Sequence, residues 1–447
     1  MPSEYFSKKI MNWFKLALQL KSFPIKQTTI DFKEVISLND KDFATYKLHK
    51  RRTIVEYHLA NNSFYQSLVG NKKWAWEDLP ILTKQDLQQS LENRLSKGFS
   101  AKNVFVNKTS GSSGTPFIFA KDKYAHAFTW SHIMHLYKQY HIIPNQSYEA
   151  RFYGIPYDFV GKSKEKIKDA MAGRYRFDVF NLNDEVLSKY VQLFQQKKFD
   201  YINGYTSSIL QLAKYLKRQN LVLRDLCPSL KLCIVTSEML FDEDKIIMQE
   251  SFGVPVVNEY GASELDVIAF QSPEDVWEIN DKTLYVEVVD DSGEVVPFGE
   301  EGNIVITSLY NKAHPFIRYQ IGDRGSIDLH PTTGRPVLKK LIGRTNDFAV
   351  LPSGKKVPGL TFYYVTKSVI ENNGKVKEIK VIQHKVDDFE VEYASSEVLS
   401  SEEKNKIFQA METYLEKGLN IRFTNVSELK REKSGKLKQF TSKLKVD

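Results

Sequence analysis

Between about residues 100 and 345 the chain alternates short apolar runs with longer amphipathic segments. The runs Leu232–Thr236 and Val254–Val257 have the length and β-branched content of buried strands. Helical spacing of apolar residues is found in Asp184–Lys197, Ser207–Arg218 and Asp242–Phe252. Because strands that alternate with helices pair in parallel, the pattern predicts an α/β sheet that binds ligands at the carboxyl ends of its strands.

A second pattern follows, in which strand-like segments are joined without helices. Thr283–Val289 and Asn303–Thr307 are separated by the turn signals of Asp291–Gly293 and Pro297–Gly299. Strands joined only by turns pair in an antiparallel manner, so we expect a β subdomain beside the α/β sheet.

The regions before residue 100 and after residue 347 indicate further helices and a further domain. Residues 41–70 have helical spacing, and Thr83 with Asp86 resembles a capping box at the end of the phrase Trp76–Lys84. Beyond residue 347 the pattern indicates a small α+β domain. Its expected strands are Phe348–Leu351, Val376–Ile382 and Phe389–Tyr393, and its expected helices are Thr361–Asn372 and Ser401–Lys417.

The predicted organisation is a lead-in with an amphipathic helix at residues 1–40, a large N-terminal domain at 41–346 and a small C-terminal domain at 347–447. A chain of 447 residues is too long for one ordinary core, which agrees with two or three folding units. The predicted fold class is therefore α/β with a β subdomain, followed by a smaller α+β domain.

Charge and cysteine content limit the classes of partner. The net charge of +8, from 63 basic and 55 acidic residues, is compatible with an anionic ligand. Neither a zinc-finger spacing nor an aromatic ribonucleoprotein signature accompanies it, so we expect no nucleic-acid partner. Two cysteines, Cys227 and Cys233, are too few for a disulfide framework and favour the cytoplasm.

The opening segment Tyr5–Phe23 has the pattern of a basic amphipathic helix. Lysines interrupt its apolar run, which argues against a membrane-spanning helix, and no small-residue cleavage site of a signal peptide follows it. Packing against the main domain is the favoured interpretation, and weak contact with an anionic membrane surface is the alternative.

The segment Lys108–Pro116 combines glycines with hydroxyl-bearing residues after a strand-like run. Glycine lets the backbone approach a phosphate closely, and hydroxyl and amide groups donate to its oxygens. The segment is neither a Walker A sequence nor GxGxxG, and by composition alone a flexible Ser/Gly loop is an equal alternative. The residues that would face a polyphosphate are Thr109, Ser110, Gly111, Ser112, Ser113, Gly114 and Thr115.

A group of histidines on a predicted helix is interpreted as structural or solvent-facing. Neither an HExxH pattern nor a third ligand accompanies it, and the absence of GxSxG removes support for a serine hydrolase. The histidines are His126, His132, His135 and His141.

Further polar segments follow the loop in the order and spacing found in the adenylate-forming superfamily of acyl-CoA synthetases, adenylation domains and luciferases. They are Ser237–Met239, Asn258–Glu264, Arg318–Gly325, Gly343–Asp347 and Lys430–Lys438. Over residues 41–440 the chain most resembles the phenylacetate-CoA ligase branch and its CapK-type relatives of capsular polysaccharide biosynthesis. The phrases Trp76–Lys84 and Phe199–Tyr205 contribute to this resemblance.

The resemblance implies roles for the residues of Asn258–Glu264. Tyr260 would stack on adenine, Ser263 would approach the α-phosphate, and Glu264 would hold magnesium, a hard cation that prefers oxygen ligands. Glu259 and Gly261 belong to the same motif and are counted among the nucleotide contacts.

The neighbouring motifs imply further contacts to the nucleotide. Ser237 and Glu238 fall where the family places a turn that contacts adenine, with Ser237 in place of a usual glycine. Asp323 would accept hydrogen bonds from both ribose hydroxyls, because a carboxylate can accept from two donors. Arg344 would reach the ribose or a phosphate, and Asp347 would be the hinge to a small mobile C-terminal domain.

By the same resemblance, Lys436 would be the adenylation lysine, with Lys433 as the alternative if the register is shifted. It would bridge the carboxylate and the α-phosphate as negative charge concentrates in the transition state. Thr109 and Glu264 complete the implied catalytic set. A solvated basic segment is the competing interpretation of this lysine-rich stretch.

The implied activity is the use of ATP and Mg²⁺ to convert a small carboxylate into an acyl-AMP, followed by acyl transfer in surface polysaccharide or secondary metabolite biosynthesis. The acceptor is either coenzyme A or an amine or hydroxyl of a sugar or amino acid. A non-catalytic nucleotide-binding scaffold is an alternative of another class. We expect the acyl pocket between Arg151 and Tyr205 and near Val235, where Arg151, Arg174 and Arg176 either bind an acidic substrate or form surface pairs.

Overall fold

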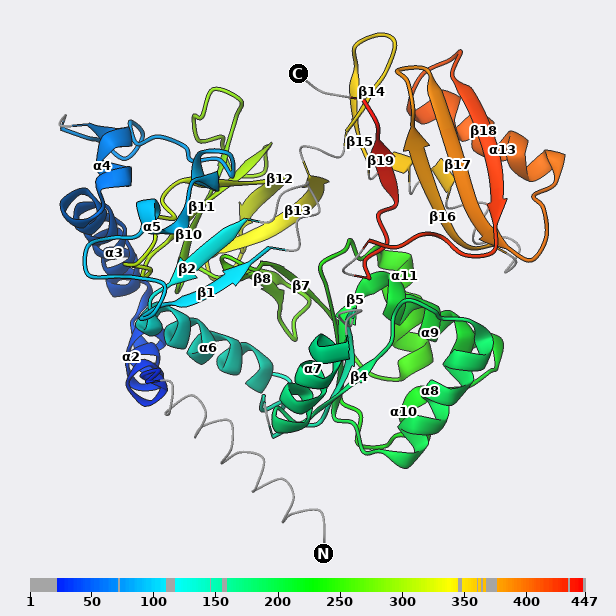
Figure 1. Cartoon of the computed structure of the whole chain (residues 1–447), viewed down its shortest axis with the longest axis horizontal. Helices are drawn as coiled ribbons and strands as arrows, with labels where there is room; N and C mark the ends of the chain where they lie inside the picture. The colour runs from blue at the N-terminus through cyan, green and yellow to red at the C-terminus, as the bar shows by residue number, and fades with distance from the viewer. Residues whose placement is uncertain are drawn as a thin grey trace, which may run out of the picture. The chain divides into compact units, whose positions relative to one another are not determined.

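The computed structural model shows two units that are divided by their internal contacts (Figure 1). The first extends to Ile321 and resumes at Gly325–Lys340, and the second comprises Gly322–Arg324 and the chain from Leu341 onward. The structure describes residues 22–70, 73–109, 117–144, 146–154, 159–344, 348–359, 361–362, 365–366, 376–432 and 435–444, with the side chains of 159–164, 358 and 377 left out. The predicted helix at Tyr5–Phe23 therefore lies almost entirely outside the described residues.

Three helices lead into the first unit: α2 (Ile25–Ser37), α3 (Asp40–Asn61) and α4 (Ser63–Val69). Residues 41–70, expected to be helical throughout, form two helices because Asn62 leaves the helical backbone conformation and caps the second one, accepting a hydrogen bond from the Tyr65 amide. Within the described part of the chain, no helix combines the length and the hydrophobicity needed to cross a bilayer.

The capping box at Thr83 and Asp86 is confirmed. The Asp86 carboxylate accepts from the Thr83 amide at 2.7 Å, and the Thr83 hydroxyl accepts from the Asp86 amide at 3.4 Å. Only the short 3-10 helix η1 (Asp86–Gln88) follows, and α5 (Leu91–Arg94) begins soon after it.

An eleven-stranded sheet is the frame of the first unit, in the order β10-β11-β12-β13-β9-β8-β7-β6-β5-β3-β4. Strands β4, β3, β5, β6 and β7 pair in parallel, whereas β8 pairs antiparallel with both neighbours and β10 pairs antiparallel with β11. The α/β sheet and the antiparallel β region are therefore both confirmed. The strands are β3 (Glu149–Phe152), β4 (Arg174–Phe177), β5 (Tyr201–Tyr205), β6 (Leu232–Thr236), β7 (Val256–Ala262), β8 (Asp266–Gln271), β9 (Trp277–Ile279), β10 (Leu284–Val289), β11 (Glu301–Ser308), β12 (Tyr319–Leu329) and β13 (Pro336–Arg344).

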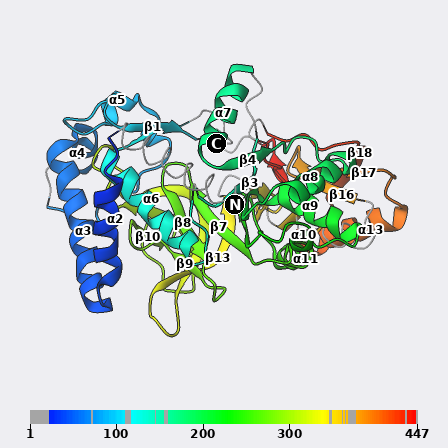
Figure 2. The same ribbon diagram turned by 90° about the horizontal axis from the view of Figure 1, so that it is seen from below.

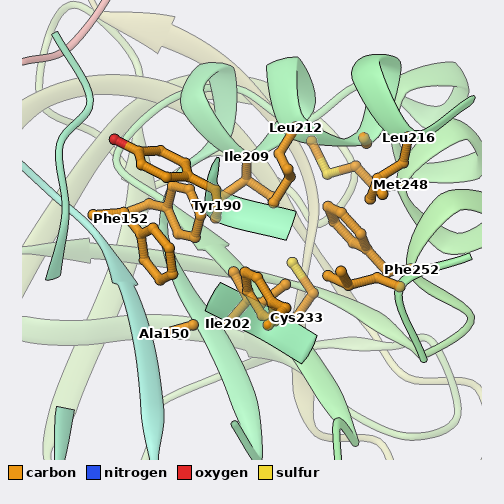
Figure 3. Packing of buried hydrophobic residues seen from close by; sticks show 14 of the residues in the cluster. Ala150, Phe152, Tyr190, Ile202, Ile209, Leu212, Leu216, Cys233, Met248 and Phe252 are labelled. Carbon is orange, nitrogen blue, oxygen red and sulfur yellow. The ribbon is translucent and has the colours of Figure 1, made fainter. Parts of the chain in front are cut away.

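Helices cover both faces of the parallel strands. On one face an apolar core joins the strands to α8, α9 and α11, with Ala150, Phe152 and Ile202 facing Ile209 and Met248 of the helices (Figure 3). The other face packs against α6, on which α2 also lies (Figure 2). The helices of this region are α6 (Lys123–Lys138), α7 (Phe159–Met171), α8 (Asp184–Gln196), α9 (Thr206–Arg218), α10 (Leu223–Leu226) and α11 (Asp242–Phe252).

Arg318 anchors the phrase Trp76–Lys84 to the sheet. Its guanidinium is buried and donates to the carbonyl oxygens of Glu77, Leu79 and Gly293 at 2.9 to 3.1 Å. These three bonds hold the phrase and the turn after β10 against the start of β12. The arginine of the Arg318–Gly325 motif therefore has a structural role.

The second unit contains a four-stranded sheet in the order β18-β17-β16-β19, with α13 packed in its core. Ser400 and Glu403 form a capping box at the start of α13. The predicted helix at Thr361–Asn372 lies mostly outside the described residues, and the other predicted elements of this region are confirmed within a few residues. The elements are β14 (Phe348–Val350), β15 (Lys356–Pro358), β16 (Val376–Gln383), β17 (Asp388–Ser395), α13 (Ser401–Tyr414), β18 (Asn420–Val426) and β19 (Phe440–Ser442).

Gly204 of β5 lies where β3 and β5 approach each other closely. A Cβ at this position would lie inside the contact distance of the Phe152 carbonyl oxygen on the neighbouring strand. We expect Gly204→Ala to lower the free energy of unfolding by roughly 1–3 kcal/mol, because the strands must move apart. Urea denaturation of the full chain measures this, and an unchanged midpoint would show that the strands separate without cost.

Candidate functional site

The Ser/Gly-rich loop lies at the end of a hairpin formed by β1 (Phe105–Lys108) and β2 (Ile118–Lys121). Beyond the last strand pair, the Thr109 amide donates to the Phe117 carbonyl at 2.9 Å and the Phe117 amide donates to the Thr109 hydroxyl at 3.1 Å. Thr109 thus holds the two ends of the loop together. The predicted phosphate contacts from Ser110 to Thr115 lie outside the described residues.

Lys121 connects this hairpin to the turn between β7 and β8. Its side chain is only 6% exposed and forms an ion pair with Asp266, while its ammonium group also donates to the Ser263 carbonyl oxygen at 3.4 Å. A buried ammonium group requires such partners, since an unpaired charge away from water is costly. The loop-bearing hairpin and the turn containing Ser263 are therefore held side by side.

Glu264 is buried and receives a hydrogen bond from the Tyr319 hydroxyl at 3.1 Å. The Tyr319 ring stacks with that of Phe117 at a centroid distance of 6.5 Å, so Tyr319 contacts both the end of the loop and the carboxylate. One hydroxyl donor leaves most of the acceptor capacity of a carboxylate available. Glu264 can therefore ligate a hard cation such as Mg²⁺ beside the loop.

Tyr260 and Gly261 lie at a register shift of the β7–β8 hairpin. The Tyr260 side chain is buried and makes an edge-on contact with Trp277 at 6.4 Å. A Cβ on Gly261 would lie 2.6 Å from the carbonyl oxygen of Asp266, so only glycine allows the two strands to approach here.

Ser237 and Glu238 form the turn after β6. Ser237 has a φ of +71°, a conformation that favours glycine, which explains why a glycine is usual at this point of the family pattern. The Glu238 carboxylate accepts from the Ser207 amide at 2.7 Å, and its carbonyl oxygen accepts from the Thr206 hydroxyl at 3.2 Å. The Glu238 side chain therefore caps α9.

Glu259 points toward α6. Its carboxylate accepts a hydrogen bond from the Tyr137 hydroxyl at 3.3 Å, and its backbone pairs in register with Thr236 of β6. Burial raises the pKa of Glu259 to about 7, against the opposing effects of hydrogen bonds from Tyr137 and Thr236 and of the charge of Arg151.

Asp323 and Arg344 both belong to the second unit and form an ion pair, with 3.6 Å between Arg344 Nε and Asp323 Oδ1. The Asp323 side chain is 12% exposed and that of Arg344 is 53% exposed. The predicted hinge Asp347 lies outside the described residues.

The segment that carries Lys436 is anchored to the second unit by Arg431. Its guanidinium donates to the Glu378 carboxylate at 2.5 Å and to the Gly435 carbonyl at 3.4 Å. The Lys436 carbonyl accepts from the Glu432 amide at 3.0 Å. The Lys436 backbone is therefore held next to Glu432, and Lys433 lies outside the described residues.

The histidines have structural surroundings. His126 stacks on Phe105 at 4.0 Å, and His132 and His135 contact Phe32 and line a cavity of about 260 Å³ between α6 and β9. Among the described residues, no group of three or more His, Cys, Asp or Glu side chains is arranged to hold a metal ion. His141 follows α6 in a left-handed conformation.

Sequence reasoning missed Lys121, Tyr319 and Arg431 as site residues. Tyr319 lies inside the quoted Arg318–Gly325 motif and Arg431 inside the basic segment, so proximity to a motif was the available signal. Lys121 gave no such signal, because its partner Asp266 is 145 residues further along the chain.

Comparison with known proteins gives related sequences over parts of the chain. Residues 352–443 match the CapK C-terminal domain family. The chain is 32% identical over 173 residues to a phenylacetate-coenzyme A ligase of Pseudomonas putida, which covers 36% of this chain and only 38% of that relative. It is 23% identical over 319 residues to the protein CapK of Staphylococcus aureus, which covers 65% of this chain and 66% of CapK.

Solved structures of similar fold cover most of the chain. A 2-hydroxyisobutyryl-CoA ligase in the postadenylation state, in complex with 2-HIB-AMP, has a TM-score of 0.69 at 17% identity and covers 91% of this chain and 90% of its own. ATP-bound MatB from Rhodopseudomonas palustris has a TM-score of 0.52 at 16% identity and covers 73% of this chain and 65% of its own. The predicted fold and the resemblance to the phenylacetate-CoA ligase and CapK branch are confirmed.

Arg431→Met should destabilise the second unit, because it leaves the largely buried Glu378 carboxylate without its guanidinium partner. Loss of one partner of a buried pair costs about 3–5 kcal/mol. Amide hydrogen exchange in β16 and β17 measures this loss. The double variant Arg431→Met/Glu378→Met should recover most of it, and a double variant as unstable as the single one would show that the ion pair is not responsible.

Glu259 should make stability depend on pH. Its folded pKa of about 7 lies above the ordinary value of 4.5, so protonated Glu259 contributes stability below pH 4.5 that is lost as the pH rises through about 7. The free energies of unfolding of the wild type and of Glu259→Gln should be measured between pH 4 and 8. As the pH rises through this window, the wild type should lose stability relative to the variant by up to about 1.4 kcal/mol per pH unit. The facing groups Tyr137, Thr236, Arg151 and Glu149 are shared by both proteins, and a constant difference would contradict the raised pKa.

Proposed function

We propose that this chain, a relative of phenylacetate-coenzyme A ligase and CapK with the fold of an adenylate-forming CoA ligase, is an AMP-forming ligase. It uses ATP and Mg²⁺ to activate a small carboxylic acid as an acyl-AMP and then transfers the acyl group. The observation that carries the proposal is the convergence of distant motifs: Tyr319 stacks against Phe117 at the end of the loop and donates to Glu264.

The residues around the loop suit a magnesium-bound polyphosphate. Glu264 offers carboxylate oxygens to the metal, and Thr109 fixes the ends of the loop that would bind the phosphates. Bound Mg²⁺ supplies positive charge that stabilises the leaving pyrophosphate. Lys121 is committed to Asp266 and Ser263, so its role is to position the turn that carries Glu264.

The adenylation step needs no covalent enzyme intermediate. A carboxylate oxygen of the acid attacks the α-phosphorus of ATP, and the bond to the bridging oxygen breaks as pyrophosphate leaves with the electron pair. In this proposal, Tyr260 stacks on adenine and Asp323 accepts from the ribose hydroxyls. Lys436 stabilises the negative charge that concentrates between the acid and the α-phosphate.

The acceptor separates two forms of the proposal. Coenzyme A is supported by the similarity to phenylacetate-coenzyme A ligase and by the fold shared with 2-hydroxyisobutyryl-CoA ligase. An amine or hydroxyl of a sugar or amino acid, used in building a surface polysaccharide, is supported by the match to CapK and to its C-terminal domain family. Mass spectrometry of the products formed when coenzyme A or amino sugars are added to the enzyme with its acyl-AMP distinguishes them.

Lys436→Ala should lower carboxylate-dependent exchange of pyrophosphate into ATP by roughly 100- to 1000-fold, because a donor to the transition-state charge is lost. Lys430→Ala is the matched control, since Lys430 is exposed in the same basic segment and should exchange at the wild-type rate. Lys433→Ala tests the shifted register.

Two results would contradict the proposal. Exchange at the wild-type rate in Lys436→Ala would remove the catalytic role of this lysine. Absence of exchange by the wild type with aromatic, fatty, amino and sugar acids would favour a non-catalytic nucleotide-binding protein instead.

A further inference from the structure

A cluster of polar side chains lies on the α6-facing side of the parallel strands. Ala150, Phe152 and Ile202 point into the apolar core on the opposite side, as Figure 3 shows. Because side chains alternate along a strand, their neighbours face α6. The polar residues of β3, β5, β6 and β7 on this side are called the strand-end cluster. They are Glu149, Arg151, Tyr201, Asn203, Thr236 and Glu259.

Hydrogen bonds link members of the strand-end cluster in two groups, one around Glu149 and one around Tyr137. Glu149 accepts from Arg151 at 2.8 Å and from the Tyr201 hydroxyl at 3.2 Å. The Asn203 amide donates to the Tyr137 hydroxyl at 3.4 Å, which in turn donates to Glu259 at 3.3 Å. Tyr137 of α6 therefore closes the cluster over the sheet.

The strand-end cluster contains one more carboxylate than it contains cations. Arg151 is paired with Glu149, and among the described residues no lysine, arginine or histidine lies within ion-pair distance of Glu259. Tyr137 and Thr236 give Glu259 only neutral donors. Glu259 is only partly exposed. A carboxylate that is partly withdrawn from water without a cation is unfavourable, and a cationic group placed beside Glu259 would relieve that cost.

Arg151 adds a second requirement. Its Nε atom is buried and has no hydrogen-bond partner among the residues that the structure describes, while its guanidinium stacks 4.1 Å from the centre of the Tyr153 ring. A buried donor left without an acceptor costs free energy. A ligand that contacts the strand-end cluster would therefore gain from an acceptor atom as well as from a cationic group.

The position of the strand-end cluster relates it to the acid, and this step rests on the proposed function. Thr236 is the last residue of β6 and pairs in register with Glu259 of β7, and the two residues precede Ser237 and Tyr260. Ligands of open α/β sheets bind at the carboxyl ends of the parallel strands. Alternation along β7 directs Glu259 to the face opposite that of Tyr260, so a nucleotide stacked on Tyr260 leaves Glu259 to the acyl part of the ligand.

The other arginines of this region do not point to an acidic substrate. Arg174 and Arg176 both donate to Asp169, at 2.5 and 2.7 Å, and Arg176 also pairs with Glu165 at 3.0 Å, so the two guanidinium groups already face two carboxylates within the chain. With Arg151 paired to Glu149, no unbalanced cation of these three remains for a second carboxylate.

We propose that the acid activated by this chain carries a primary ammonium group, as amino acids do, and that Glu259 accepts that group. The Glu259 carboxylate forms a charge-assisted hydrogen bond with the ammonium group, which orients the substrate carboxylate toward the nucleotide. Glu259 is thus a specificity-determining residue, and the substrate class is that of amino acids rather than aryl or fatty acids.

Pyrophosphate exchange with matched acids tests the substrate class. Each set shares a carbon skeleton and differs in one substituent: alanine, lactate and propionate, or phenylalanine, phenyllactate and phenylpropionate, with β-alanine added. We expect kcat/KM of the best ammonium-bearing acid to exceed that of its hydroxy and unsubstituted analogues at least about tenfold, since a charge-assisted hydrogen bond is at stake.

Variants of Glu259 assign the preference to this residue. Glu259→Gln should lower kcat/KM for the ammonium-bearing acid by roughly 10- to 100-fold and leave that of its neutral analogue unchanged. Glu259→Asp, which keeps the charge, should retain the preference. Glu278→Gln on β9 is the matched control, because Glu278 is exposed and lies outside the strand-end cluster.

The outcomes separate this inference from the proposed function. Exchange with unsubstituted or aryl acids but not with their amino analogues would overturn the inference and leave an adenylate-forming enzyme. An equal loss for all acids in Glu259→Gln would show a structural role and overturn it as well. Absence of exchange with every acid would overturn the proposed function itself.

Discussion

The ammonium group of Lys121 holds together two segments that are 145 residues apart in the sequence. It bonds to Asp266 and to the Ser263 carbonyl, and its side chain is almost fully removed from solvent. A buried ion pair contributes little net stability compared with an apolar contact, but it permits few alternative arrangements of its partners. The hairpin that carries the Ser/Gly-rich loop therefore has a defined position beside the turn that carries Glu264, and Tyr319 completes the contact from a third segment.

The parallel strands perform different tasks on their two faces. Ala150, Phe152 and Ile202 fill the core under α8, α9 and α11, and that core holds the strands in register. The residues between them form the strand-end cluster, whose carboxylates and single guanidinium would be costly without the hydrogen bonds that they share. The apolar face thus provides the rigidity that a buried polar network requires.

Much of the fold could be predicted from the sequence because its signals are local. Leu232–Thr236 and Asp242–Phe252 have the observed bounds of β6 and α11, since an apolar run and a helical pattern are each ended by turn-forming residues. The break at Asn62 was missed because a capping asparagine inside a helical pattern resembles a tolerated polar residue.

The candidate site could be predicted less completely, because its contacts are not local. The motif residues could be identified by resemblance, but the bond from Tyr137 to Glu259 spans 122 residues and follows no local pattern. Glu259 was grouped with the nucleotide contacts because it lies in their motif, whereas the alternation of β7 directs its side chain toward α6. A motif shows only that its residues are close in sequence. The alternation of side chains along the strand determines which face of the sheet each residue lies on.

Adjacent residues of one strand face different surroundings, and this affects how such a protein can evolve. Gly204, which lets β5 approach β3, lies next to Asn203, which takes part in the polar network. Mutations at one position therefore act on folding, and mutations at its neighbour act on what the sheet contacts. Drift at alternate positions changes what the polar face of the sheet contacts while the core remains the same, so proteins can share this architecture at low sequence identity.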